Sequence, residues 1–286
     1  MSASDAAVIA ETLSSPAESQ LPQAQTGIER RLRFLRTYGS WRRAVRELWR
    51  FKWRENRQKE MIGGYHTRGN GVPYFVRHTT RDIGVFSEIF VLGEYEPPAE
   101  VADILKTLGR APRILDVGGN IGLFATFARD RWPGAHVVAM EPDPDNLEIL
   151  RRTAAQRSDL EVVAACASTH DGTLRFVAGE EAGSHVAETA SDENTIEVPC
   201  VDVFGLAASA DLIKMDIEGS EWPILADPRL ADVPARAIVL EWHDLLCPHP
   251  EPRVAAREAL ERAGFAVIED RVAFPEVGMI WAVRRS

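Results

Sequence analysis

The stretch ILDVGGNIGLF, residues 114–124, decides the fold. Its first apolar run ends at Asp116, and three glycines, Gly118, Gly119 and Gly122, stand before the next apolar segment. That order predicts a strand, a glycine turn and a helix. Glycines at a strand end let a ligand approach the backbone, and the helix start behind them offers N–H groups that have no partner inside the helix. We therefore expect a ligand at this turn.

The next apolar run, HVVAM at 136–140, ends in Glu141 and Pro142. An acid at the end of the second strand is placed to hold the two hydroxyls of a ribose. A dinucleotide site has the pattern G-x-G-x-x-G, because the pyrophosphate sits on the helix N-terminus. Here Asp116 stands at the first glycine, where a carboxylate would repel a pyrophosphate and suit a cationic ligand. The sequence favours S-adenosylmethionine over NAD, and the alternative is a turn whose glycines serve only tight packing.

Length and composition limit the class of protein to which the chain can belong. The 286 residues, 45% of them hydrophobic, are enough for one domain with a buried core and an extension. The cysteines at 166, 200 and 247 form no zinc pattern and favour a reducing compartment. No apolar run is long enough to span a bilayer, and the N-terminus lacks a signal-peptide core. We therefore expect a cytoplasmic protein.

The net charge of −10 is unevenly distributed. Residues 27–60 carry twelve Lys and Arg against four Asp and Glu, so the rest of the chain is strongly acidic. An acidic body is a poor general binder of nucleic acid, because contact with phosphates is electrostatic. The basic segment is the exception to this argument.

Four regions follow from these patterns. Residues 1–26, rich in Ser, Ala, Gln and Pro, predict a disordered tail. Residues 27–70 form a basic extension, helical from Ile28 to about Lys59, that ends in a glycine-rich break at 62–71. We expect its tryptophans to pack on the main domain. A membrane-surface helix, or a contact for an anionic or carrier-bound substrate, is the alternative. A lead-in segment occupies 71–110 and the main domain 111–286.

Strands and helices alternate along the main domain. This alternation predicts a doubly wound parallel sheet with helices on both faces. The last two strands have no helix between them and predict an antiparallel hairpin at one edge, and a β-rich insert occupies 173–199. The expected strands are 113–117, 136–141, 161–165, 211–216, 237–242, 265–269 and 278–284, and the expected helices are 121–131, 144–157, 219–226 and 252–263.

Two further strand ends carry acids. DLIKMDIEGSEWPIL, 211–225, places Asp216 and Glu218 after an apolar strand, and AIVLEWH, 237–243, places Glu241 and His243 at the matching end. Ligands bind at the carboxyl ends of strands in open α/β sheets. A spacing of two residues in extended chain puts both members of each pair on one face.

This cluster has three interpretations. A hydroxyl acceptor must lose its proton during methyl transfer, and His243 or a carboxylate could accept it as a general base. Alternatively Asp216, Glu241 and His243 could bind Mg or Mn, which would lower the pKa of the hydroxyl. In the third interpretation Glu218 and Glu221 only cap or solvate the helix start, and His243 is a satisfied hydrogen-bonded residue.

The two motifs together resemble the FkbM family of S-adenosylmethionine-dependent methyltransferases, over about residues 72–286. The lead-in also resembles the family, at Arg77, Asp82, Phe86, Glu88, Glu94 and Tyr95. LEWH at 240–243 and ALERAGF at 259–265 fit its last strand and helix. The residues that match its acidic segment are Lys214, Asp216, Glu218, Gly219, Ser220 and Glu221.

The resemblance implies a class I methyltransferase fold and methyl transfer to a hydroxyl of a sugar, polyketide, lipid or other secondary metabolite. Asp216, Glu218, Glu241 and His243 would face the acceptor, with Asp216, Glu241 and His243 as the catalytic residues. A nucleic-acid methyltransferase that uses the basic helix, or a non-catalytic cofactor-binding module, is the competing interpretation, and homo-oligomerisation is left open. The implied cofactor-binding residues are Tyr95, Asp116, Gly118, Gly119, Asn120, Gly122, Glu141, Pro142, Cys166, Asp216 and Glu218.

Overall fold

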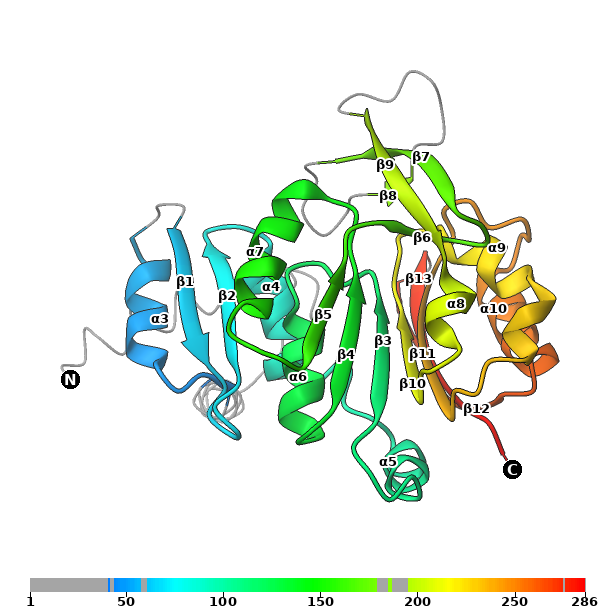
Figure 1. The fold of residues 1–286 in the computed structure, drawn as a ribbon, viewed down its shortest axis with the longest axis horizontal. Coiled ribbons are helices and arrows are strands. Elements are labelled where there is room, and N and C mark those ends of the chain that lie inside the picture. The colour runs from blue at the N-terminus through cyan, green and yellow to red at the C-terminus, as the bar shows by residue number, and fades with distance from the viewer. Residues whose placement is uncertain are drawn as a thin grey trace, which may run out of the picture.

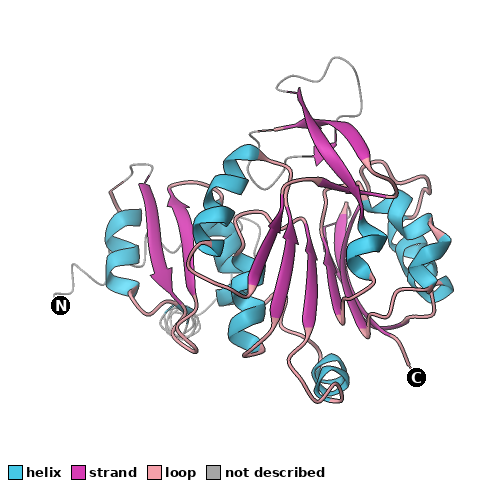
Figure 2. Ribbon diagram, in the orientation of Figure 1, coloured by secondary structure: helices cyan, strands magenta, loops and turns pink. Residues whose placement is uncertain are grey.

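A central sheet with helices on both faces forms the body of the protein (Figures 1 and 2). The predicted tail at 1–26, and residues 27–40 of the basic extension, lie outside the part described here. The computed structural model describes residues 41, 44–57, 61–178, 185–186, 195–274 and 276–285.

The central sheet has seven strands in the order β12-β13-β11-β10-β3-β4-β5. All run parallel except β13, which is antiparallel to both β11 and β12. The short link between β12 and β13 leaves no room for a crossover helix, so that pair must be antiparallel. The doubly wound sheet with a C-terminal hairpin is thus confirmed. The strands are β3 (Arg113–Val117), β4 (His136–Met140), β5 (Leu160–Val163), β10 (Leu212–Met215), β11 (Ala237–His243), β12 (Ala266–Phe274) and β13 (Val277–Val283).

Two hydrophobic cores cover the two faces of the sheet. Neighbouring residues of each strand point to opposite faces, so that Ile114 belongs to one core and Leu115 to the other. Burial on both faces explains why these strands are nearly continuous apolar runs. The first core includes α5 (Ala99–Lys106), α6 (Leu123–Arg131) and α7 (Pro144–Ala154), and the second includes α8 (Val203–Ala207), α9 (Glu221–Ala226) and α10 (Pro252–Arg262).

The region before the main domain differs from the sequence expectation. Within the described residues the basic extension is helical at Trp41 and Ala44 and in α3 (Leu48–Glu55). The glycine-rich stretch 62–71 is only partly a break, because its first half lies in β1 (Met61–His66), which pairs with β2 (Pro73–His78), and the chain turns at 68–70. Gly64 is tolerated in β1 because the ring of Phe75 fills the space of the missing side chain. The hairpin packs between α3 and α7 (Figure 1), and α4 (Asp82–Phe86) and the π-helical turn η2 (Ser87–Leu92) follow it.

The β-rich insert forms a second, smaller sheet over the carboxyl edge of the main one (Figure 1). Its strands are β6 (Cys166–Ser168), β7 (Gly172–Val177), β8 (His185–Val186) and β9 (Thr195–Asp202). Arg229, in the 3-10 turn η4 (Pro228–Ala231), joins it to the main domain through Asp202 at 2.6 Å and the carbonyl of Thr169 at 2.8 Å. The sequence did not predict α8 or η4, which are only one turn long.

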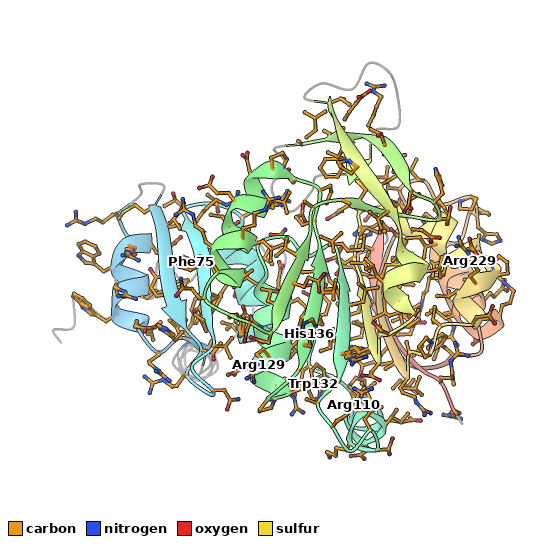
Figure 3. The ribbon with its side chains drawn as sticks, viewed as in Figure 1. Phe75, Arg110, Arg129, Trp132, His136 and Arg229 are labelled. Atoms are coloured by element: carbon orange, nitrogen blue, oxygen red, sulfur yellow. The ribbon has the colours of Figure 1, made fainter. Side chains whose placement is uncertain are left out.

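The two edges of the main sheet differ in character. Arg110, Arg129, Trp132 and His136 lie at the amino edge (Figure 3), whereas the acids singled out in the sequence follow the opposite, carboxyl ends of the strands. Among the described residues no helix has both the length and the apolar character needed to cross a membrane.

Candidate functional site

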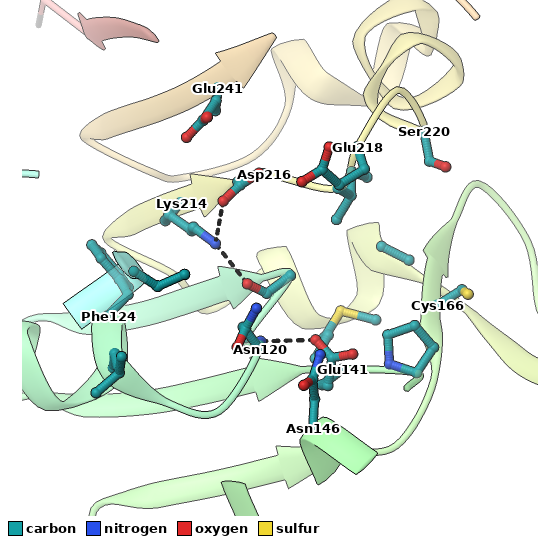
Figure 4. Close-up of a pocket in the computed structure, with 18 of the residues that line it drawn as sticks. Asn120, Phe124, Glu141, Asn146, Cys166, Lys214, Asp216, Glu218, Ser220 and Glu241 are labelled. Carbon is teal, nitrogen blue, oxygen red and sulfur yellow. Dashed lines mark hydrogen bonds and ion pairs between the residues drawn. The ribbon is translucent and has the colours of Figure 1, made fainter. Parts of the chain in front are cut away.

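A cleft of about 1080 Å³, part of it open to solvent, lies at the carboxyl edge of the sheet (Figure 4). It is lined by residues that follow β3, β4 and β10, and by β11, the small sheet and η2. Ten of the predicted site residues line it, and Asp116, Gly122 and His243 do not. The ten are Tyr95, Gly118, Gly119, Asn120, Glu141, Pro142, Cys166, Asp216, Glu218 and Glu241.

The glycine turn wraps closely around the neighbouring strand ends. Gly118 has a φ of 84°, and a Cβ there would stand 1.8 Å from the backbone oxygen of Asp216. Only glycine can adopt this positive φ and also leave room for the backbone oxygen of Asp216. The amides of Gly118 and Gly119 bond the carbonyl of Met140 at 3.2 and 2.7 Å, so the turn is joined to the end of β4.

Glu141 supports the glycine turn from the end of β4. Its Oε2 accepts a hydrogen bond from the Asn120 amide, and its Oε1 accepts one from the Asp143 amide, both at 2.8 Å. Burial raises the pKa of Glu141 to about 7, although these two hydrogen bonds act in the opposite direction. Each carboxylate oxygen keeps a second lone pair, so the group can still accept hydrogen bonds from a diol.

Beyond Glu141 the cleft becomes apolar. Pro142, Ala165, Ala167 and Phe176 line this end together with Cys166. Burial raises the pKa of the Cys166 thiol to about 12, so it stays protonated and acts as a small apolar contact. An apolar slot beside a diol-binding acid is the setting that an adenine and its ribose require.

Asp116 lies beneath the cleft, which differs from the expectation that it contacts the ligand. Its side chain is 0% exposed, and its Oδ1 is 3.4 Å from the Nζ of Lys214, its register partner on β10. Burial raises the pKa of Asp116 to about 6, and the charge of Lys214 limits the rise. Because Asp116 lies beneath the cleft, its position does not support the expected repulsion of a pyrophosphate by contact.

Lys214 joins the two halves of the site. Its Nζ donates to the carbonyl of Gly118 at 2.6 Å and lies 3.3 Å from Oδ2 of Asp216 (Figure 4). Burial alone would lower the pKa of Lys214, but the charges of Asp216 and Asp116 outweigh burial and raise it above its usual value. The sequence analysis quoted this residue only as a family match. One charged residue in the four-residue apolar strand LIKM was the available signal, because a buried charge needs a partner.

Three side chains meet at the inner end of the cleft. The hydroxyl of Tyr95 lies 2.9 Å from Oε2 of Glu241 and 3.2 Å from Oδ2 of Asp216. Burial, reinforced by the charge of Asp216, raises the pKa of Glu241 to about 8. Burial would also raise the pKa of Asp216, but the charges of Lys214 and His243 outweigh it and hold that pKa below its usual value. Neighbouring carboxylates whose pKa values are pushed apart are typical of acid–base sites.

His243 is held between two acids behind the cleft. Its Nδ1 lies 3.3 Å from Oε1 of Glu221, and its Nε2 lies 3.4 Å from Oε2 of Glu218. Burial would lower the pKa of His243, but the hydrogen bond with Glu221 and the neighbouring charges raise it to about 9. An imidazole that is protonated at neutral pH cannot accept a proton, so the geometry favours a carboxylate over His243 as the base.

Glu221 is not solvated at the start of α9, one of the two roles in the third interpretation. Its side chain is fully buried, and its two oxygens accept the backbone amides of Gly219 and His243 at 2.9 and 2.7 Å. It therefore joins the turn after β10 to the end of β11. Glu218, in this turn, has a φ of 51°, and burial raises its pKa to about 7.

The outer wall of the cleft is also acidic. Glu88 and Glu94 come from η2 and the loop behind it. Burial raises the pKa of both, that of Glu94 to about 7. Among the described residues that line the cleft, Lys214 is the only basic one.

The donors for a metal ion are also close together. Ligand atoms of Asp216, Glu241 and His243 all lie within 4.8 Å of one another, as the metal interpretation requires. Carboxylate and imidazole donors fit Mn, and carboxylates fit Mg. Each of these donors, however, already faces Tyr95, Lys214 or a glutamate. An ion would therefore have to replace existing hydrogen bonds and ion pairs.

Comparison with known proteins identifies the family. The model of the methyltransferase FkbM domain matches residues 116–267. The 31-O-demethyl-FK506 methyltransferase FkbM of Streptomyces tacrolimicus is 31% identical over 171 residues, which cover 46% of this chain and 65% of that protein. Methyltransferase sdnD of Sordaria araneosa is 33% identical over 93 residues, 32% of this chain and 33% of that protein. The chain thus spans less than two thirds of the length of either relative.

More distant similarities come from solved structures. The magnesium protoporphyrin IX methyltransferase of Synechocystis PCC 6803, solved with bound SAM, is 13% identical with a TM-score of 0.43, over 70% of this chain and 84% of that one. Fibrillarin of Aeropyrum pernix, also with bound S-adenosyl-L-methionine, is 14% identical with a TM-score of 0.38, over 61% and 67%. Because the family model matches more than half of the chain, from the end of β3 to the start of β12, the protein belongs to the FkbM methyltransferase family.

Proposed function

We propose that the protein is an S-adenosylmethionine-dependent O-methyltransferase that acts on a hydroxyl of a small molecule. Family membership supports methyl transfer. The observation that carries the choice of oxygen is the carboxyl of Glu241, which lines the inner end of the cleft with a pKa of about 8. A group that titrates near the working pH is suited to accept the proton of a hydroxyl.

The residues of the cleft fit both parts of the cofactor, the nucleoside and the methionine. Glu141 would bind the ribose hydroxyls, while the apolar end at Pro142, Cys166 and Phe176 would hold the adenine. The backbone of Gly118 and Gly119 would approach the methionine part, with Tyr95 at the inner end of the same cleft. When bound, the cofactor supplies an activated methyl group on a sulfonium.

The proposed reaction is an in-line displacement. S-adenosylmethionine, held by Glu141 and the glycine turn, would supply its methyl group to the acceptor oxygen, and the electron pair of the broken carbon–sulfur bond would stay on the sulfur. The hydroxyl proton passes to Glu241. The chain's main contributions are positioning of the two reactants and a negative field toward the sulfonium from Asp216 and its neighbours. Lys214 keeps Asp216 ionised, because it holds the pKa of that carboxyl low.

The acidic residues that line the cleft favour a small acceptor without phosphate groups. Glu88, Glu94 and Glu218 all line the cleft. Their charges would repel a phosphate backbone, which argues against a nucleic-acid acceptor. A sugar, polyketide or lipid hydroxyl is the acceptor class that we propose. Turnover on such a panel, read as S-adenosylhomocysteine release, separates an enzyme from a non-catalytic binding module.

Glu141→Ala is expected to weaken S-adenosylmethionine binding by about 100-fold, since each hydrogen bond to a charged group contributes roughly 1.5–3 kcal/mol. The change removes the diol acceptor and also frees the amide of Asn120. Calorimetric titration of the cofactor measures the dissociation constant. Glu148→Ala, on an exposed surface of α7, is the matched control and should bind like wild type. Equal binding by both variants, or binding of NAD in place of S-adenosylmethionine, would contradict the assignment.

Glu241→Gln is expected to lower turnover about 10²–10⁴-fold, the usual contribution of a general base. Only the ionised carboxylate accepts a proton, so wild-type turnover should rise with pH, be half-maximal near pH 8 and level off above it, as the pKa of Glu241 implies. The variant should lose that rise and keep its affinity for the cofactor. Glu261→Gln, half exposed on α10, is the control. A variant with full turnover and an unchanged pH profile would remove Glu241 from the chemistry.

A divalent ion is the second candidate for activating the hydroxyl, favoured by the closeness of the donors on Asp216, Glu241 and His243. The two candidates differ in their response to chelation. General-base catalysis by Glu241 predicts that turnover survives EDTA and gains nothing from added Mg or Mn. Loss of turnover in EDTA, restored by one of these ions, would support the metal instead.

A further inference from the structure

The three tryptophans of the basic extension have unlike surroundings. Trp41 is 4% exposed and stacks on Phe86 at 5.2 Å between ring centroids, as expected for a core residue. Trp49 is 79% exposed and Trp53 is 42% exposed. The expectation that the tryptophans pack on the main domain is therefore wrong for the last two, and their exposure needs a separate explanation.

The two exposed indoles lie on one outward face of α3. Residues 49 and 53 are one turn apart, so their side chains are neighbours on the helix surface. Two exposed arginines flank α3, Arg46 in the turn before it, with its guanidinium beside Gly71 of the hairpin turn, and Arg57 in the turn after it. The guanidinium of Arg57 lies 4.1 Å from the ring centroid of Trp53. We call these four residues the outer face of α3.

The opposite side of α3 is already occupied. Phe51 is fully buried and packs against Tyr65 at 4.9 Å between ring centroids. Arg50 donates to the carbonyl of Gly64 at 2.7 Å, and Arg54 donates to the hydroxyl of Tyr65 at 3.3 Å. These contacts hold the helix on the hairpin and leave the outer face to solvent. The fold thus presents the indoles outward on a well-anchored helix.

Adjacent exposed tryptophans with flanking arginines indicate a membrane surface. Single exposed apolar residues are ordinary on soluble proteins, but two neighbouring indoles form a patch. Tryptophan has an apolar body and a polar N–H and is enriched where hydrocarbon meets water, while arginine binds lipid phosphates. The exposed residues around α3 therefore have the composition of a membrane-surface site.

The distribution of charge on the protein indicates that the membrane surface is anionic. The described residues around α3, 44–57, carry five Lys and Arg against two Glu, in a chain of net charge −10. In Figure 1, α3 lies at one end of the long axis, with the hairpin between it and the acidic main domain. A screening length of about 8 Å at physiological salt lets a local basic face act independently of distant acids. The complementary partner is an anionic lipid surface.

We propose that Arg46, Trp49, Trp53 and Arg57 dock the protein on the surface of an anionic lipid bilayer. The indoles enter the headgroup region, and the guanidiniums pair with lipid phosphates. The inference does not rest on the proposed methyl transfer, because α3 contributes no residue to the cleft.

The test is co-sedimentation of the full chain with vesicles of phosphatidylcholine containing phosphatidylglycerol, compared with vesicles of phosphatidylcholine alone. Wild type should partition onto the anionic vesicles and much less onto the neutral ones. Trp49→Ala/Trp53→Ala should lower the partition at least about tenfold, and Arg46→Ala/Arg57→Ala about tenfold with a weaker salt dependence. Val272→Ala, an exposed apolar residue on β12, and Arg262→Ala/Arg285→Ala, which removes two charges from exposed positions in the C-terminal region, should match wild type.

Two further measurements complete the test. The tryptophan variant should keep the melting temperature of wild type, because both side chains are on the surface, and wild-type fluorescence should be quenched by vesicles with brominated acyl chains. Equal partition of wild type and the tryptophan variant, or no preference for anionic vesicles, would overturn the proposal. Tighter binding to single-stranded RNA than to these vesicles at the same salt would assign the face to nucleic acid instead.

Discussion

Lys214→Met is expected to lower the free energy of unfolding by about 3–5 kcal/mol, the usual cost of removing one partner from a buried ion pair. Lys214 is 3% exposed, and its ammonium lies among the carboxylates of Asp116 and Asp216 and the carbonyl of Gly118. Methionine keeps the approximate length and loses the charge. Asp116, which is fully buried, would then have no cation beside it. Urea unfolding at fixed pH measures the loss.

The effect of Lys214→Met should depend on pH in a defined direction. The pKa of Asp116 in the folded protein is about 6, above the usual 3.8, and removal of Lys214 raises it further. A group whose folded pKa is raised contributes stability at low pH and loses it as the pH rises through that pKa. The deficit of the variant should therefore be smallest near pH 5 and largest near pH 8.

Two further variants test whether the effect comes from the buried ion pair. Asp116→Asn combined with Lys214→Met removes both charges and should recover part of the lost stability, because the two residues act as a pair. Lys106→Met removes an exposed lysine paired with Asp103 and should change stability by no more than about 0.5 kcal/mol. A loss below about 1 kcal/mol for Lys214→Met, or a loss independent of pH, would show that the ion pair does not support the site.

Gly118→Ala is expected to abolish measurable cofactor binding and to destabilise the fold by about 3 kcal/mol or more, since overpacking and a positive φ act together. The added methyl would stand 1.8 Å from the backbone oxygen of Asp216. Backbone cannot rotate away as a side chain can, so the glycine turn and the end of β10 must separate. That displacement would also move Gly118 away from Lys214. Calorimetric titration and thermal unfolding report the two effects.

Gly205→Ala is the matched control for this change. Gly205 lies in α8, where a Cβ meets nothing within 4 Å and φ is not positive. Alanine is favoured over glycine inside a helix by roughly 0.5–1 kcal/mol, so this variant should be slightly stabilised and bind the cofactor normally. If Gly118→Ala behaved like Gly205→Ala, the close approach of the two strand ends would not be a requirement of the site.

The sequence predicts the central elements well because their signals are local. The run ending at Asp116, the glycines after it and the acid at Glu141 each depend on residues only a few positions apart. Period-two spacing likewise predicts that Glu241 and His243 share a face, and their ligand atoms lie within 4.8 Å of each other. Errors occur where local signals are weak, as at β1, a strand that occupies the first half of the expected break at 62–71.

The assignment of roles within the site needed the fold. His243 is the residue whose usual pKa suits a general base, yet Glu221 and Glu218, which lie in another part of the chain, keep it protonated at neutral pH. Glu241 has an ordinary pKa in the unfolded chain, and burial near Asp216 raises it to about 8. Such shifts depend on neighbours that no short stretch of sequence contains.

The sequence by itself determined the order of strands, glycine turn and helices, the acids at the strand ends and the resemblance to one family, because short-range periodicity and residue type are sufficient for these. Only the tertiary structure decided that Asp116 faces Lys214 rather than the cleft, since this follows from the register of β10 against β3. Tertiary packing also decided that Trp41 is buried while Trp49 and Trp53 face solvent. Trp41 precedes α3, and on α3 itself Phe51 takes the one side that packs on the hairpin; the sequence alone does not show which side that is.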